Sequence, residues 1–123
     1  MSNIFKKTLL YDFYGELLTK HQKEIYELYH LNDFSLGEIA EQLKISRQGV
    51  HDTLKRCEKQ LENYESKLQL VDKFLINKQN VEKICNYASE IFDSFKEDKK
   101  SQEIVADRIA DIQETCNRIL ENL

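Results

Sequence analysis

The feature that most constrains this chain is its shortage of residues that interrupt helices. The 123 residues contain no proline and only three glycines, Gly15, Gly37 and Gly49. Because proline and glycine normally mark turns, their scarcity favours long helices over a β fold with many turns. Hydrophobic residues make up 41% of the sequence, which is enough to build a packed core. We therefore predict an all-α protein with one compact domain, alone or with a helical extension.

Local signals define the first helices. Apolar residues at steps of three and four predict a helix over residues 4–18. The pairs Thr19–Gln22 and Ser35–Glu38 have the spacing of a capping box, in which the cap and the third helical residue bond each other's backbone. They predict two more helices, and the second of these is the short segment LGEIAEQL.

The segment SLGEIAEQLKISRQGVHDTLKR has the pattern of a helix-turn-helix. Ala40 is a small residue expected to be buried where two helices cross, Lys44-Ile45 is expected to turn, and Ser46 is placed to cap the second helix. The second helix of such a unit lies in the major groove of DNA, with its N-terminal residues toward the bases. The candidate nucleic-acid-binding residues follow from this register: Ser46, Arg47, Gln48, His51, Lys55 and Arg56.

The charge pattern both favours and opposes nucleic-acid binding. Arg47 and Gln48 have side chains suited to bidentate contacts with guanine and adenine. Basic residues outnumber acidic ones over residues 46–59, whereas the whole chain has a net charge of -4. Asp52 adds a negative charge to the same helix, so binding would rest on a local patch. The alternative is that the helix-turn-helix is a stable packing unit that binds protein.

A heptad pattern begins at Val50 and predicts one long helix over residues 46–75. At about 1.5 Å per residue this helix would be about 45 Å long, more than the helix-turn-helix can cover. We expect the exposed seam to pair two copies of the chain in a homodimer. The predicted dimer-interface residues are Leu61, Tyr64, Leu68, Val71 and Leu75.

The rest of the chain is also expected to be helical. Wide apolar faces predict two further helices over residues 81–95 and 104–123, joined by the polar segment 96–102. The expected organisation is a helix-turn-helix domain over residues 1–58 and a helical extension over 59–123 that serves dimerisation or partner binding.

The sequence lacks the patterns of several other protein classes. The three cysteines and three histidines lack the spacing of a metal site, and no glycine-rich phosphate loop occurs. We expect no metal, no cofactor and no enzymatic activity. Apolar runs are too short to span a membrane, and the N-terminus does not resemble a secretory signal. We therefore expect a cytoplasmic protein without membrane insertion and with free thiols.

Residues 11–65, YDFYGELLTKHQKEIYELYHLNDFSLGEIAEQLKISRQGVHDTLKRCEKQLENYE, resemble the YlxM-like family of small helix-turn-helix proteins. They are also similar to the C-terminal DNA-binding region of bacterial sigma factors. The sequence departs from the family at Gly49 and His51, where alanine and an aromatic residue are expected. The resemblance implies a sigma-region-4-like helix-turn-helix followed by a long helix and two further helices.

The resemblance also implies a function. It indicates a bacterial regulatory protein of the signal recognition particle pathway, whose partners would be the GTPase of that particle, its RNA, or both. The alternative is a DNA-binding transcriptional regulator, which rests on the helix-turn-helix and its local basic excess. A third possibility, a structural dimer module, rests on the heptads alone.

Overall fold

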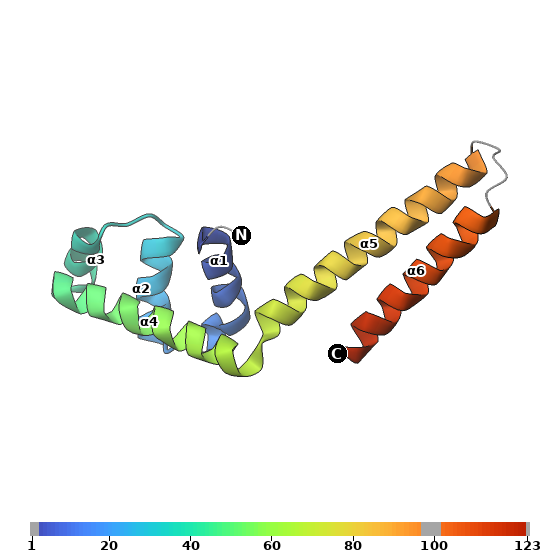
Figure 1. Cartoon of the computed structure of the whole chain (residues 1–123). Coiled ribbons are helices and arrows are strands. Elements are labelled where there is room, and N and C mark those ends of the chain that lie inside the picture. The colour runs from blue at the N-terminus through green and yellow to red at the C-terminus, as the bar shows by residue number, and fades with distance from the viewer. Residues whose placement is uncertain (1–2, 97–101, 123) are drawn as a thin grey trace. The chain divides into compact units, whose positions relative to one another are not determined.

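The computed structural model describes residues 3–96 and 102–122, which contain helices and no strand, as predicted. In chain order the elements are α1 (Asn3–Tyr14), the 3₁₀ turn η1 (Gly15–Leu17), α2 (Lys20–His30), α3 (Leu36–Leu43), α4 (Arg47–Leu68), α5 (Leu70–Lys96) and α6 (Gln102–Glu121) (Figure 1). Two compact units divide between Val71 and Asp72, so the boundary expected at 58/59 falls inside α4.

The predicted capping boxes are confirmed. The Thr19 hydroxyl accepts a hydrogen bond from the Gln22 amide at 3.2 Å, and the Gln22 side chain accepts one from the Thr19 amide at 3.0 Å. Ser35 and Glu38 make the same reciprocal pair, with both bonds at 3.1 Å. These short-range bonds begin α2 and α3 where the sequence predicted, because every group in them lies within three residues of the cap.

The first helix is shorter than predicted. It ends at Tyr14, and Gly15–Leu17 form a 3₁₀ turn instead of continuing the helix to residue 18. Leu18 is extended, with φ −77° and ψ 154°, which delivers the chain to the Thr19 cap. The turn also needs glycine at position 15, because a Cβ there would lie 2.9 Å from the ring of Tyr11.

Helix α4 runs across α1, α2 and α3 and completes the core of the first unit (Figure 1). The core consists of apolar side chains from all four helices, among them Leu10, Tyr14, Ile25, Ile39, Val50, Leu54, Cys57 and Leu61. Cys57 is fully buried, as expected for a small hydrophobic residue, and this burial raises the pKa of its thiol to about 11.

The long helix predicted over residues 46–75 is interrupted. Helix α4 ends at Leu68, Gln69 adopts a left-handed conformation with φ 56°, and α5 begins at Leu70. The prediction of a single helix up to residue 75, followed by another from residue 81, was therefore wrong. The break lies at Gln69, and α5 continues unbroken through residues 76–80.

Two side chains from the first unit hold this break in place. The Tyr14 hydroxyl donates to the Glu65 carboxylate at 2.6 Å and accepts a hydrogen bond from the Leu70 amide at 3.0 Å. Glu65 accepts a second bond, from the Val71 amide, at 2.9 Å. The first amides of a helix have no partner within it, so this pair satisfies two of them at the start of α5. The negative carboxylate is also favourable at the positive end of the helix dipole.

The second unit is a hairpin of two antiparallel helices, α5 and α6 (Figure 1). Its inward seam follows a heptad spacing on both helices, and all its members are buried or half-buried. On α5 the seam contains Asn77, Asn80, Ile84, Tyr87, Ile91 and Ser94. On α6 it contains Val105, Arg108, Ile112, Thr115, Ile119 and Asn122.

Arg108 links the two helices of this hairpin. Its guanidinium forms an ion pair with Glu90 at 2.5 Å, pairs with Asp111 on its own helix, and lies 5.6 Å from the centre of the Tyr87 ring. Because Glu90 and Tyr87 belong to α5, these contacts fix the antiparallel register. The predicted helix over 104–123 corresponds to α6, while residues 97–101 of the expected connector and Leu123 lie outside the described residues.

Candidate nucleic-acid interface

The helix-turn-helix is formed by α3, a tight turn and the start of α4. Lys44 ends α3 in the left-handed conformation, with φ 57° and ψ 44°. The amides of Lys44 and Ile45 both donate to the carbonyl of Ala40, the second at 3.1 Å. Ser46 then caps α4, since its hydroxyl accepts a hydrogen bond from the Gly49 amide at 2.9 Å. The predicted turn and cap are confirmed.

Packing between the two helices fixes the direction of α4. Ile39 of α3 and Val50 of α4 are fully buried, and Leu54 is nearly so. Ala40 is half-buried, so the point where the helices cross is more open than the sequence predicted. Because this apolar contact covers one side of α4, its opposite side is left free to meet a ligand.

The candidate nucleic-acid-binding residues lie outside this apolar contact. All six are exposed: Ser46, Arg47, Gln48, His51, Lys55 and Arg56. Asp52 lies among them and accepts a hydrogen bond of 2.9 Å from the side-chain amide of Gln48. The same carboxylate lies 3.7 Å from Nδ1 of His51. Gln48 would therefore have to release Asp52 before its amide could bond a base.

A second acidic residue of α4 is engaged by side chains of two other helices. Glu58 lies 3.8 Å from the Lys7 ammonium on α1 and 3.6 Å from Nε2 of His30 on α2. Burial lowers the pKa of His30, and the opposing attraction of the Glu58 carboxylate only partly offsets this effect. The contribution of Glu58 was missed in the sequence, because its partners come from two other helices. Asp52 and Glu62 are the exposed acidic residues of α4, and Asp52 lies among the candidate residues.

The predicted dimer-interface residues occupy different environments. Leu61 and Val71 are buried in the first unit, at 1% exposure each. Tyr64 and Leu75 are half-buried, and the ring of Tyr64 lies 5.9 Å from that of Tyr14. Leu68 is exposed. The break at Gln69 interrupts the straight seam that was expected to connect them, and self-association itself stays a prediction.

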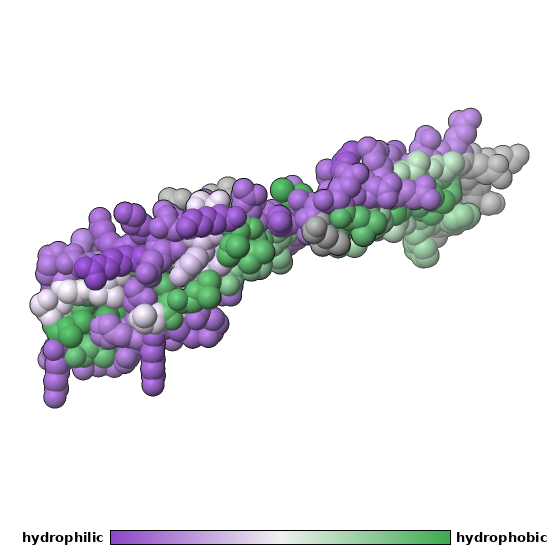
Figure 2. Space-filling model, turned by 90° about the horizontal axis from the view of Figure 1, so that it is seen from below, coloured by the Kyte–Doolittle hydropathy of each residue, from purple (hydrophilic) through white to green (hydrophobic). Residues whose placement is uncertain are grey.

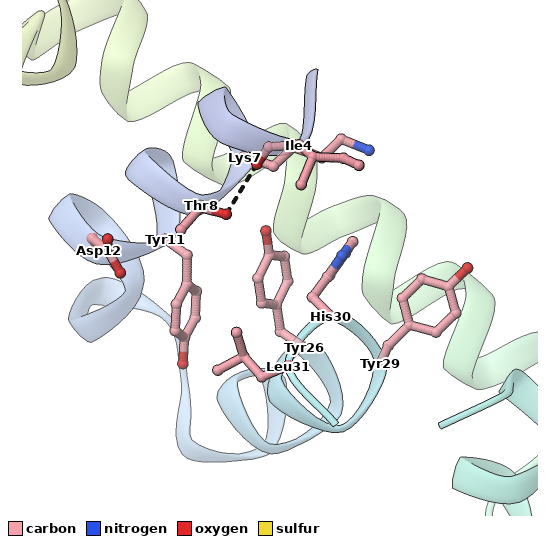
Figure 3. Close-up of a pocket in the computed structure, with 9 residues that line it drawn as sticks. All are labelled: Ile4, Lys7, Thr8, Tyr11, Asp12, Tyr26, Tyr29, His30 and Leu31. Carbon is pink, nitrogen blue, oxygen red and sulfur yellow. Dashed lines mark hydrogen bonds between the residues drawn. The ribbon is translucent and has the colours of Figure 1, made fainter. Parts of the chain in front are cut away.

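A pocket of about 370 Å³ lies between α1 and α2, and none of the candidate nucleic-acid-binding residues lines it (Figure 3). Aromatic side chains line much of it, and two of them, Tyr11 and Tyr26, are stacked with ring centres 4.7 Å apart. The Tyr11 hydroxyl is bonded to Glu27 at 2.5 Å, and burial raises the pKa of Tyr26 to about 12. These groups stabilise the contact between the two helices and have no arrangement typical of acid–base catalysis.

Residues 3–96 and 102–122 contain neither of two other kinds of site. No cluster of three or more His, Cys, Asp or Glu side chains there is placed to hold a metal ion. None of the helices in these ranges has the length and apolar character needed to cross a membrane.

The fold and the exposed start of α4 define this chain as a helix-turn-helix protein. A family model described as "Putative helix-turn-helix protein, YlxM / p13 like" matches residues 1–112. The chain belongs to this family, UPF0122, which confirms the resemblance found in the sequence.

Bacterial relatives extend the match over most of the chain. This chain is 47% identical over 117 residues to a UPF0122 protein of Acetivibrio thermocellus, and the match covers 94% of this chain and all of that protein. It is 52% identical over 80 residues to UPF0122 protein YlxM of Bacillus subtilis, covering 65% and 73% of the two chains. A UPF0122 protein of Caldanaerobacter subterraneus is 64% identical over 77 residues, which are 63% of this chain and 66% of that protein.

Proposed function

We propose that this chain is a regulatory protein that binds nucleic acid through the exposed side of α4. The observation that carries the proposal is the separation of charge on that helix. Arg47, Lys55 and Arg56 are exposed on it, whereas the carboxylate of Glu58 lies near Lys7 of α1 and His30 of α2. A cationic helix at the surface of a helix-turn-helix suits contact with phosphates.

We further propose that the physiological setting is the signal recognition particle pathway, with the particle's RNA, its GTPase or both as partners. This step rests on the family to which the chain belongs. The Gln48–Asp52 hydrogen bond weighs against direct reading of bases in duplex DNA, and the overall charge of -4 favours a protein partner. A DNA-binding transcriptional regulator is the alternative, and the exposed Arg47 and Gln48 favour it.

Salt-dependent binding tests the role of α4. Fluorescence anisotropy would measure binding to a duplex DNA and to the hairpin RNA of the signal recognition particle over a salt titration. The double variant Arg47→Ala, Lys55→Ala should bind more weakly, and its slope of log affinity against log salt should fall by about one unit per lost phosphate contact. The matched control is Lys20→Ala, Lys67→Ala, which removes two exposed charges away from the candidate residues. Equal losses in both variants, or no binding by the parent at low salt, would refute the proposal.

Pull-down from a bacterial lysate separates the two settings. A regulator of the signal recognition particle should retain the GTPase after nuclease treatment if the contact is with protein, and lose it if the contact is through RNA. A transcriptional regulator should instead recover DNA and show a large ratio of specific to non-specific affinity. Absence of both the GTPase and the RNA from the captured material would exclude the proposed pathway.

A further inference from the structure

The α5–α6 hairpin has an apolar surface that the hairpin itself does not cover. Five of the six residues that directly follow seam positions of α5 are apolar and exposed, namely Val81, Cys85, Ala88, Phe92 and Phe95, and the sixth is Lys78. The same positions of α6 contain Ala106, Ile109, Gln113, Cys116 and Leu120, all exposed except Cys116, which is half-buried. Figure 2 shows hydrophobic residues gathered along one side of this hairpin and hydrophilic residues along the other.

Helix geometry places both sets on one face of the hairpin. A residue that follows a seam position lies about 100° further around its helix. When the hairpin is viewed from one end, successive residues turn clockwise around one helix and anticlockwise around the other, because the two helices are antiparallel. The positions after the seam therefore lie on the same side of the pair. We call this surface the apolar face.

The seam inside the hairpin buries few apolar side chains. Half of its twelve seam positions carry polar side chains: Asn77, Asn80, Ser94, Arg108, Thr115 and Asn122. Oδ1 of Asn77 and Nδ2 of Asn122 are buried without a hydrogen-bond partner. A polar seam specifies register but contributes little apolar burial. Most of the large apolar side chains of this unit thus lie on its outside, which is the arrangement of one half of a larger bundle.

We propose that the apolar face packs against the same face of a second copy of the chain, so that two α5–α6 hairpins form a four-helix bundle. Charge and area both favour a second copy. Among the described positions of the face, Lys78 is the only charged residue, so two identical faces meet without extensive repulsion. Two helices side by side over about 30 Å, each about 10 Å wide, present about 600 Å². Two copies then bury about 1,200 Å², which reaches the range of stable interfaces.

The chain offers a matched pair of variants to test this contact. Val81 and Ile109 lie on the apolar face at 50% and 46% exposure. Ile76 and Ile104 precede seam positions, so they lie on the other side of the same helices at 47% and 51% exposure. Replacing either pair with glutamate makes the same chemical change at equal exposure, and only the first pair lies in the proposed interface.

Sedimentation equilibrium of the full chain, without nucleic acid, measures the result. The parent should sediment at twice its chain mass of 14.6 kDa at micromolar concentrations and above. Val81→Glu, Ile109→Glu should raise the dissociation constant by about a hundredfold or more, whereas Ile76→Glu, Ile104→Glu should change it by less than about threefold. A monomeric parent, or equal effects of the two variants, would overturn the proposal. Neither result depends on the nucleic-acid-binding function of α4.

A second readout needs no variant. Cys85 lies on the apolar face and is exposed in the single chain, while Cys57 is buried. If two copies cover this face, alkylation of Cys85 by a maleimide should slow as the protein concentration rises. Peptide mass spectrometry identifies the modified cysteine. A rate for Cys85 that is the same from low to high protein concentration would contradict the proposed contact, even if the glutamate variants lost helicity.

Discussion

The hydroxyl of Tyr14 and the carboxylate of Glu65, 51 residues apart in sequence, are joined by a buried hydrogen bond of 2.6 Å. Tyr14 is at the end of α1, and Glu65 is in the last turn of α4. Together they bond the first two amides of α5. The bond therefore connects three helices, and it explains how a chain can leave the helical path at Gln69 without glycine or proline.

Replacing Tyr14 with phenylalanine tests this bond. The variant keeps the ring in the core but leaves Glu65 and the Leu70 amide each short of a buried partner. We expect the free energy of unfolding to fall by about 1–3 kcal/mol. Chemical denaturation monitored by circular dichroism measures it. Tyr29→Phe is the control, because Tyr29 is exposed at the surface and should change stability by less than about 0.5 kcal/mol. Equal stabilities of the two variants would contradict the assigned role.

The left-handed turn at Lys44 predicts a gain in stability. A side chain with φ 57° is strained relative to glycine, which adopts this conformation freely. Lys44→Gly should therefore raise the free energy of unfolding by up to about 1 kcal/mol. The same change at Lys59, an exposed position inside α4, should lower it by about 1 kcal/mol. Thermal unfolding of both variants measures the contrast, and a loss at Lys44 would argue against the left-handed turn.

The glycines of α3 and η1 should respond in opposite directions to alanine. A Cβ on Gly15 would approach the Tyr11 ring to 2.9 Å and displace it from its contacts with Tyr26 and Glu27. We expect Gly15→Ala to destabilise the protein by about 1–3 kcal/mol. A Cβ on Gly37 would meet only the Ser35 hydroxyl, at 4.0 Å. Gly37→Ala should therefore stabilise by about 0.5–1 kcal/mol through helix propensity. Urea denaturation compares them, and destabilisation by Gly37→Ala would be unexpected.

His30 predicts a dependence of stability on pH. Burial lowers its pKa below the ordinary value of 6.5, so this histidine binds a proton more tightly in the unfolded chain than in the folded chain. The free energy of unfolding should then fall as pH drops below about 6.5 and stop falling below the pKa of the folded state. His30→Gln should flatten this part of the profile. Identical profiles for the parent and His30→Gln would refute the assignment.

Much of the fold was predictable because its determinants are local. The boxes at Thr19 and Ser35 and the cap at Ser46 each act over three residues, so the starts of α2, α3 and α4 could be placed from the sequence. The break at Gln69 could not, since its stabilising groups are brought together by tertiary packing and the residue itself is not a usual left-handed one.

The same contrast between local and tertiary determinants applies to the candidate site. The helix-turn-helix register placed the candidate residues at the outer surface of α4, and all six are exposed. The orientation of Glu58 was not predictable, because it depends on Lys7 and His30 from helices that the sequence alone does not position. The six nucleic-acid-binding assignments remain predictions until binding is measured.

The Tyr14–Glu65 cap also has a consequence for biosynthesis. Starting a helix is the costly step in its formation, and the first amides of α5 obtain their partners from α1 and α4. A ribosome releases the N-terminal part of a chain first, so both capping groups leave the exit tunnel before the amides they bind. The residues that cap α5 are therefore made before α5 itself. A nascent chain can begin α5 on an N-terminal unit that has already folded.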